Sequence, residues 1–374
     1  MHRERTVKTT KITSMLFAAV ALIACGGSGS SAPTTIGTGT GTTIPTTGSQ
    51  QGTTIGNGTT PATSAGTAST STATTIPGTP MMPLTGLPIK DPALAARPAL
   101  VVKIDNHPDA RPQSGLNRAD IVFEENVEQL TRFAAVFQSQ TPDPVGPIRS
   151  GREQDVQLLG SLNKPVFAWS GGNPGVTAAI NGSDFVVANV QTNARQASKS
   201  YRSKDRGVPH NLYAQGSGLF TMAPAGATPP PPQFQYLKAG DTAAGAPSSG
   251  ADVQMDGVKV RWTYETKSGT YLRFQSGKAH NDAALGQVNS TNVVVLVVDY
   301  VQSKIYAPSP IAQTLGTGEV YLFTGGKVVH GTWTRKDRLN AFTLTADDGT
   351  PMLLTPGRTW VELARVNSTT PSPA

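Results

Sequence analysis

The sequence predicts an α/β (α+β) N-terminal domain followed by a mostly β C-terminal domain. Across residues 83–222, short apolar runs rich in β-branched side chains alternate with helix-like and Gly-rich stretches, a pattern typical of α/β folds. Across residues 252–366, strand-like runs succeed one another with Gly and Asp turns between them, which favours a β-rich domain. Each segment is long enough to build its own core.

The N-terminal domain is expected to contain four strands and one helix. Apolar, β-branched or alternating runs predict the strands, at 98–105, 119–127, 132–139 and 165–172. The helix is predicted across residues 151–163, because Val156, Leu159 and Leu162 fall on one face at helical spacing.

The C-terminal domain is expected to consist of strands joined by hairpin turns. Strand-like runs occupy residues 258–265, 271–277, 292–302, 318–335 and 342–365. The stretches "TGGK" and "DDGTP" are ordinary hairpin signals. Trp262, Trp333 and Trp360 lie within these strand patterns, so we expect most of them to pack in the core.

The first residues of the chain predict secretion and lipid attachment. Arg3, Arg5, Lys8 and Lys11 precede the apolar run "MLFAAVALIAC", which has the anatomy of a secretory signal and is too short to span a bilayer stably. The run ends at Cys25, the single cysteine of the chain, followed by two glycines. This arrangement resembles a bacterial lipobox. We therefore predict a signal peptide across 1–24, lipidation of Cys25, and anchoring at the extracytoplasmic face of the cell membrane; the alternative is an ordinary signal peptide with a chance cysteine.

Three further segments are predicted to lie outside the folded domains. Residues 25–82 contain Thr, Gly, Ser, Ala and Pro without a single charge, so they bury too little apolar surface to fold and are predicted to form a disordered tether. Pro, Gly and Ala dominate residues 223–251, which predicts a partly ordered linker. Residues 367–374 are predicted to be a disordered tail.

The charge and cysteine content exclude two classes of interaction. The formal charge of +7 falls to +4 once residues 1–24 are removed, and the remaining 27 basic and 23 acidic side chains are well mixed. Nothing in this distribution indicates nucleic-acid binding. With Cys25 lipidated, the mature chain has no cysteine for a disulfide, so its stability must come from core burial.

A dense polar loop separates the first two predicted strands. In "NHPDARPQSGL", Pro108 and Pro112 restrict the backbone and Gly115 permits a tight return, so the loop is predicted to be rigid. Rigid polar loops between sheet strands commonly lie at the ligand edge. His107, Arg111 and Asp120 are therefore candidate ligand-binding residues; the alternative is that they cap and brace the turn.

Four more candidates lie at the ends of predicted elements. Arg132 begins a strand, Arg149 and Arg152 occupy a strand-to-helix junction in "GPIRSGR", and His210 lies in "VPHN". Element ends on one edge of an α/β sheet can meet although they are distant in sequence. We therefore predict that these four converge with Arg111 and bind an anion, a phosphate or carboxylate of an envelope polymer.

Several separate motifs resemble one family. "NHPDARPQSGLNRADIVFEE", "TRFAAVFQS", "VGPIRSGR", "VPHNLY" and "GTW" with "PGRTWVEL" together resemble the YerB-like lipoproteins, a two-domain family of unknown function found in Gram-positive envelopes. The resemblance covers the chain after the tether and implies the architecture without implying a reaction. One departure is visible: a Gly-rich turn is expected before the third strand, and this chain has "EQLTR" there, beginning at Glu128.

A more distant resemblance supplies an enzymatic alternative. The order "RADI", "VGPIRSGRE" and "FAWSGGNPG" is similar to the LytR-CpsA-Psr envelope phosphotransferases. That resemblance implies a divalent metal such as Mg²⁺ held by Asp120, with Arg118, Arg149 and Arg152 on the phosphates of a lipid-linked glycan. The family's Pro-Arg-Asp segment is imperfect here, because Ile148 precedes Arg149 and Ser150 follows it.

Other chemistry lacks sequence support. There is no Gly-x-Ser-x-Gly elbow, no closely spaced His pair and no cysteine nucleophile. His280 and Asp282 in "KAHNDA" are interpreted as turn residues in preference to ligands. The sequence thus favours a non-enzymatic module that binds an anionic envelope component or a protein partner, without cofactor or metal. It specifies neither the ligand nor the oligomeric state.

Overall fold

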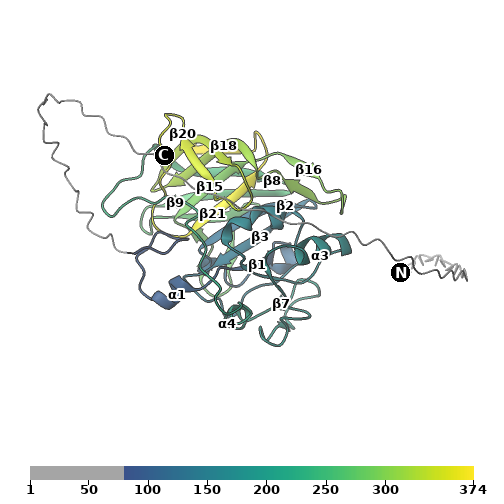
Figure 1. The fold of residues 1–374 in the computed structure, drawn as a ribbon. Coiled ribbons are helices and arrows are strands. Elements are labelled where there is room, and N and C mark those ends of the chain that lie inside the picture. Colours follow the sequence, from purple (N-terminus) through teal and green to yellow (C-terminus); the bar gives the residue numbers. More distant parts are fainter. Residues whose placement is uncertain (1–79) are drawn as a thin grey trace, which may run out of the picture. The chain divides into compact units, whose positions relative to one another are not determined.

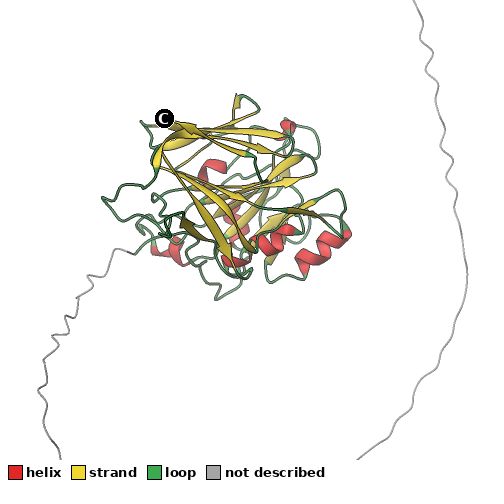
Figure 2. Cartoon of the chain, turned by 90° about the horizontal axis from the view of Figure 1, so that it is seen from above, coloured by secondary structure: helices red, strands yellow, loops and turns green. Residues whose placement is uncertain are grey.

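The computed structural model describes residues 80–374. The predicted signal peptide (1–24), Cys25 and all but the end of the predicted tether (25–82) lie outside the described residues. Within 80–374, strands build most of the fold and the helices are few and short (Figures 1 and 2). None of the helices in this part of the chain combines the length and apolar character needed to cross a membrane.

The N-terminal region is mixed α/β, as predicted. Its helices are α1 (Pro92–Ala96), α2 (Gln154–Leu158), α3 (Pro174–Asn181), α4 (Gly216–Phe220) and three 3-10 turns, η1 (Pro108–Ala110), η2 (Leu116–Arg118) and η3 (Gly160–Leu162). Its strands are β1 (Leu100–Asp105), β2 (Ile121–Val127), β3 (Leu130–Phe137), β4 (Val166–Trp169), β5 (Val186–Asn189), β6 (Tyr201–Arg202) and β7 (Leu212–Tyr213). The four predicted strands correspond to β1, β2, β3 and β4.

The C-terminal region is mostly β, again as predicted. Its longer strands are β8 (Ala246–Met255), β9 (Val258–Glu265), β10 (Thr270–Gln275), β15 (Asn292–Val297), β18 (Gly316–Thr324), β19 (Lys327–Arg335), β20 (Thr343–Ala346), β21 (Thr359–Ala364) and β22 (Thr369–Pro373). Shorter strands are β11 (Lys278–Ala279), β12 (Asn281–Asp282), β13 (Gly286–Gln287), β14 (Asn289–Ser290), β16 (Tyr300–Gln302) and β17 (Pro310–Ala312).

One sheet runs through both regions. In the N-terminal region the strand order is β2-β3-β1-β4-β5, with β1, β4 and β5 parallel and β3 antiparallel to both of its neighbours. Strand β21, near the end of the chain, lies between β2 and β15 and is parallel to both. The yellow ribbon of β21 therefore lies beside the blue β2 in Figure 1. The sequence predicts separate domain cores, whereas the structure joins the two regions through this pairing.

Alternation along the central strands sorts side chains between two apolar layers. Leu100, Val102 and Ile104 pack into a layer that also contains Trp262 of β9. Val101 packs into the opposite layer, with apolar side chains from α2 and α3. Because successive residues of a strand face opposite sides, Lys103 and Asp105 point into the layer beneath α2.

Strands occur in the linker that was predicted to be partly ordered and in the tail that was predicted to be disordered. Strand β8 begins at Ala246, inside the predicted linker 223–251, and Phe234 from the same segment is buried. The predicted disordered tail, residues 367–374, instead contains β22, which pairs antiparallel with β8. Pro371 and Pro373 donate no backbone hydrogen bond, and an edge strand tolerates this because only one of its sides is paired. The amino-acid composition of residues 367–374 does not reveal that they pair with β8.

Candidate functional site

The candidate site forms around Asp105, the last residue of β1. Its neighbour on β3 is Arg132, and Arg132 in turn lies opposite Glu125 of β2. All three side chains point to the sheet face that α2 covers, because their neighbours in sequence point to the opposite face. The ends of β1 and β3 therefore bring an acidic and a basic group together.

Asp105 is buried and gathers partners from distant parts of the chain. Its Oδ2 lies 2.7 Å from Nδ1 of His210 and 3.1 Å from Nε of Arg149. Its Oδ1 accepts a hydrogen bond of 3.0 Å from the backbone N–H of His107. The carboxylate therefore holds in place two of the residues that the sequence predicted to converge.

We use the term arginine cluster for Arg132, Arg149 and Arg152. Arg132 is only 6% exposed and donates from one terminal nitrogen to the carbonyl of Ser150 at 3.0 Å. Its Nε has no hydrogen-bond partner among the described residues. Burial, together with the neighbouring charges of Arg152 and Arg149, lowers the pKa of Arg132 to about 10. The cluster is thus crowded with positive charge and has unused donors.

Arg149 and Arg152 differ in how fully the protein pairs them. Arg152 forms a two-pronged ion pair with Glu128, with nitrogen–oxygen distances of 2.9 and 2.6 Å. Although burial raises the pKa of Glu128, Arg152 lowers it below its ordinary value. Arg149 is a quarter exposed, and its side chain donates no hydrogen bond to any residue in 80–374, because the contact with Asp105 lacks hydrogen-bond geometry. Arg149 is therefore the more available cation.

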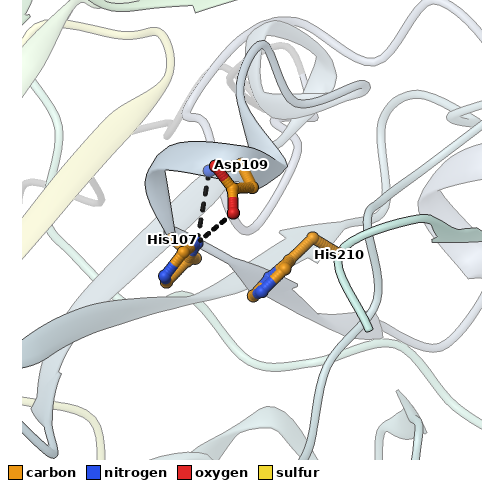
Figure 3. A group of neighbouring side chains, drawn as sticks. All are labelled: His107, Asp109 and His210. Atoms are coloured by element: carbon orange, nitrogen blue, oxygen red, sulfur yellow. Dashed lines mark hydrogen bonds and ion pairs between the residues drawn. The ribbon is translucent and has the colours of Figure 1, made fainter. Parts of the chain in front are cut away.

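His107 and His210 stack beside the cluster. Their ring centroids are 4.1 Å apart and their planes are inclined by 16°. His107 caps η1, where its Nδ1 accepts a 3.2 Å hydrogen bond from the backbone of Asp109. Figure 3 shows Asp109 turned back towards His107, with His210 alongside. Two imidazoles and a carboxylate thus meet at the loop that the sequence singled out.

The polar loop after β1 is braced by the C-terminal region. Gly115 adopts a left-handed conformation with φ 98°, and its backbone N–H donates to Asp282 at 2.9 Å. Gln113 contacts Nε2 of His280 at 2.8 Å, and Nδ1 of His280 lies 2.7 Å from Arg273. The loop is therefore held by contacts from the C-terminal region, and His280 and Asp282 have bracing roles.

Arg111 and Asp120 do not join the arginine cluster. Arg111 donates to the carbonyl of Asn106 at 3.1 Å and lines a separate cavity of about 360 Å³ together with His280. Asp120 precedes β2 and is fully buried, with Oδ2 accepting from the backbone of Gln138 and Ser139 at 2.5 and 2.8 Å.

The position of Asp120 removes the metal ligand that the distant phosphotransferase resemblance implies for this cluster. Asp120 lies at the end of β2 that is remote from Glu125, about 17 Å away at the ordinary rise of a strand. Its carboxylate also satisfies the backbone of the residues after β3. Asp120 is therefore a structural residue that closes the end of the β2–β3 pair.

Two buried ionic groups support the site from either side of the sheet. Beneath α2, the ammonium of Lys103 pairs with Glu125 and lies 2.8 Å from Asp155. Burial and the charge of Asp155 raise the pKa of Glu125 to about 7. On the opposite face, Arg273 binds both oxygens of Glu124, at 2.8 and 2.7 Å. This second pair links a β10 residue of the C-terminal region to β2.

Sequence reasoning missed the residue at the centre of the site. Asp105 ends the strand pattern "LVVKID", and a period of two already places it on the face of Lys103. That signal was available. The contact with His210 was not, because it joins residues 105 positions apart.

The fold and the site together define a class: a two-region protein whose N-terminal sheet has a polar edge lined by arginine side chains. Comparisons with known proteins agree with the architecture. The family described as "Protein of unknown function (DUF3048) N-terminal domain" matches residues 84–227, and the corresponding C-terminal domain matches residues 251–361. The chain belongs to this family, which is the YerB-like family that its motifs resemble.

One curated relative and one solved structure resemble the chain closely. The "Putative lipoprotein YerB" of Bacillus subtilis (strain 168) is 30% identical over 302 residues, which cover 75% of this chain and 85% of the relative. The crystal structure of the YerB protein from Bacillus subtilis superimposes with a TM-score of 0.68 at 25% identity, covering 78% of this chain and 99% of the other.

Proposed function

We propose that this chain is a lipid-anchored envelope protein whose arginine cluster binds an anionic group, a phosphate or carboxylate of an envelope polymer. The lipobox-like sequence at Cys25 and the lipoprotein name of the Bacillus subtilis relative support the anchor. The lipid holds the chain at the outer face of the membrane, where such polymers lie within reach of a long tether.

The observation that supports the anion site is that the guanidinium groups of Arg149 and Arg132 are incompletely hydrogen-bonded. Arg132 keeps a buried Nε–H without a hydrogen-bond partner among residues 80–374, and the Nε of Arg149 makes only an ion pair without hydrogen-bond geometry, 3.1 Å from Asp105. Buried polar groups are nearly always paired in folded proteins, so a guanidinium with an unused donor is suited to bind an anionic ligand. An anion that accepts from these groups also offsets the mutual repulsion of the three arginines. The planar guanidinium suits phosphate and carboxylate equally, which is why the polymer is defined by its charge.

Binding to isolated cell walls tests the proposal. The chain carrying Cys25→Ser is incubated with walls that retain their phosphate-bearing polymer and with walls from which that polymer has been extracted. We expect binding to the first preparation only, and competition by inorganic pyrophosphate. Removing Arg149 in Arg149→Gln should weaken binding roughly tenfold or more, because it deletes a charge-assisted contact.

A matched variant separates a specific site from general electrostatic attraction. Arg261 on β9 is exposed and pairs with Asp252 at the surface, so Arg261→Gln removes the same charge far along the sheet. The proposal expects Arg261→Gln to bind as the parent does. Equal losses in the two variants, or equal binding to extracted walls, would show that no anion site exists at the cluster.

A further inference from the structure

Three potential metal ligands meet beside the arginine cluster. One nitrogen of His107, one nitrogen of His210 and one carboxylate oxygen of Asp109 lie within 4.8 Å of one another. Nδ1 of His107 and Oδ2 of Asp109 are 3.5 Å apart. Two ligands of a tetrahedral zinc ion with bonds of about 2.0–2.1 Å are separated by about 3.3 Å. His107 and Asp109 are therefore close enough to bind one ion after a small adjustment of their side chains.

The second histidine has the outer-sphere partner that metal-binding histidines use. Nδ1 of His210 lies 2.7 Å from the buried carboxylate of Asp105. A carboxylate on one ring nitrogen places the proton there and leaves the lone pair of the other nitrogen free to bind a metal. His210 is thus prepared to donate through Nε2, and Asp105 fixes the direction of its ring.

The first histidine is free to complete the site. His107 and His210 are stacked, so the His107 ring must turn before one of its nitrogens and Nε2 of His210 can point at the same ion. The His107 side chain is 35% exposed and that of Asp109 is 71% exposed. The one hydrogen bond of the His107 ring, from the backbone of Asp109, is 3.2 Å long. The His107 ring is thus held by one stacking contact and one long hydrogen bond, and two of the three ligands are partly exposed to solvent.

The local charge is compatible with a cation. Besides the three guanidinium groups of the arginine cluster, Arg206 reaches the same loop and donates to the carbonyls of Ala110 and Pro112. Asp105, Asp109 and Glu128 supply negative charges. Arg152 is already paired with Glu128, and Arg149 lies against Asp105. Asp109 has no cationic partner among the described residues other than the neighbouring His107 ring. Asp109 is therefore the carboxylate that remains for an added cation.

We propose that His107, Asp109 and His210 bind one divalent transition-metal ion of the zinc class, with solvent in the remaining coordination position. Two imidazoles and a carboxylate favour Zn²⁺ and its neighbours over Mg²⁺ or Ca²⁺, which prefer oxygen ligands throughout. Asp105 is the positioning residue for His210. The proposal does not rest on the anion site, because none of its three ligands belongs to the arginine cluster, although Asp105 contacts both His210 and Arg149.

Calorimetric titration with Zn²⁺ tests the site. The full chain carrying Cys25→Ser is used, so that the lone thiol cannot bind the metal. We expect one Zn²⁺ per chain with a dissociation constant below about 100 µM, and visible absorption of Co²⁺ bound in its place. His107→Gln and His210→Gln should each weaken binding at least tenfold. Asp105→Asn should weaken it roughly 10- to 100-fold by loss of the outer-sphere bond.

His330 provides a matched control. It is exposed on β19 and contacts Glu319 and Asp347 at 2.9 and 2.6 Å, so it is the other described histidine with carboxylate neighbours at the surface. His330→Gln should leave Zn²⁺ binding unchanged. Binding that survives His107→Gln and His210→Gln, or that is lost in His330→Gln, overturns the proposal, as does the absence of one-to-one binding. Circular dichroism confirms that each variant is folded; His107→Gln, altered at an exposed side chain, keeps the test valid if His210→Gln unfolds.

Discussion

Arg149 and Arg152 lie three residues apart, yet the structure predicts opposite consequences for their removal. Arg152→Gln deletes a two-pronged pair whose members are 11% and 27% exposed. Hydrogen bonds to charged groups contribute about 1.5–3 kcal/mol when buried, and exposed pairs contribute about 0–1 kcal/mol. This half-buried pair should therefore contribute about 1–2 kcal/mol to the free energy of unfolding. At about 2–4 °C per kcal/mol for large chains, Tm falls by about 2–8 °C.

Arg149→Gln should have the reverse profile. Its side chain is a quarter exposed, and its contact with Asp105 lacks hydrogen-bond geometry, so we expect the free energy of unfolding to change by less than about 1 kcal/mol. A lost charge-assisted contact to the anion costs about 1.5–3 kcal/mol, roughly 10- to 150-fold in affinity. Thermal denaturation and pyrophosphate titration are run on both variants. A Tm loss in Arg149→Gln that exceeds the loss in Arg152→Gln, with pyrophosphate affinity unchanged, would refute the assignment.

Three further predictions concern the buried groups and the anchor. Glu124→Gln should lower the free energy of unfolding by about 3–5 kcal/mol in urea denaturation, because it leaves the buried Arg273 without its carboxylate. Glu362→Gln should lower it by less than about 1 kcal/mol, because burial raises the pKa of Glu362 well above its ordinary value and Gln keeps an acceptor for Trp262. Equal losses in the two variants would contradict this. The pKa of Glu125 is raised from 4.5 to about 7, so between these pH values the folded chain keeps a proton that the unfolded chain has lost. The contribution of Glu125 to stability should therefore fall as pH rises from about 4.5 to 7. A stability–pH curve that is unchanged in Glu125→Gln would disprove this. Cys25→Ala should release the protein from membranes or leave it unprocessed, and unaltered fractionation with full processing would rule out the lipid anchor.

The sequence predicts the local structure well where burial imposes a simple period. Val101 and Val102 lie in a strand buried on both faces, and such a strand appears in the sequence as a continuous apolar run. Leu159 and Leu162 are buried at the predicted helical spacing, although the predicted helix is divided into α2 and η3. In these cases the apolar side chains that form the sequence pattern are the same ones that are buried in the structure.

Long-range pairing is what the sequence does not reveal. The parallel insertion of β21 between β2 and β15 joins residues such as Phe123 and Val361, and nothing in either strand specifies its neighbour. The same limit applies to the site. Arg149 and His210 meet through Asp105, at the end of β1. The sequence predicted that these residues converge but did not identify Asp105 at the centre, and it added Arg111 and Asp120, which lie elsewhere.

The central claim is that the arginine cluster binds an anion, and the location of a heavy-atom anion tests it most directly. A crystal of the protein soaked in tungstate, an electron-rich analogue of phosphate, reveals bound anions by anomalous scattering. We predict a tungstate ion within hydrogen-bond distance of the guanidinium of Arg149 or Arg132, and its loss in crystals of Arg149→Gln. Tungstate bound only elsewhere, with the cluster vacant at saturating concentration, would contradict the account.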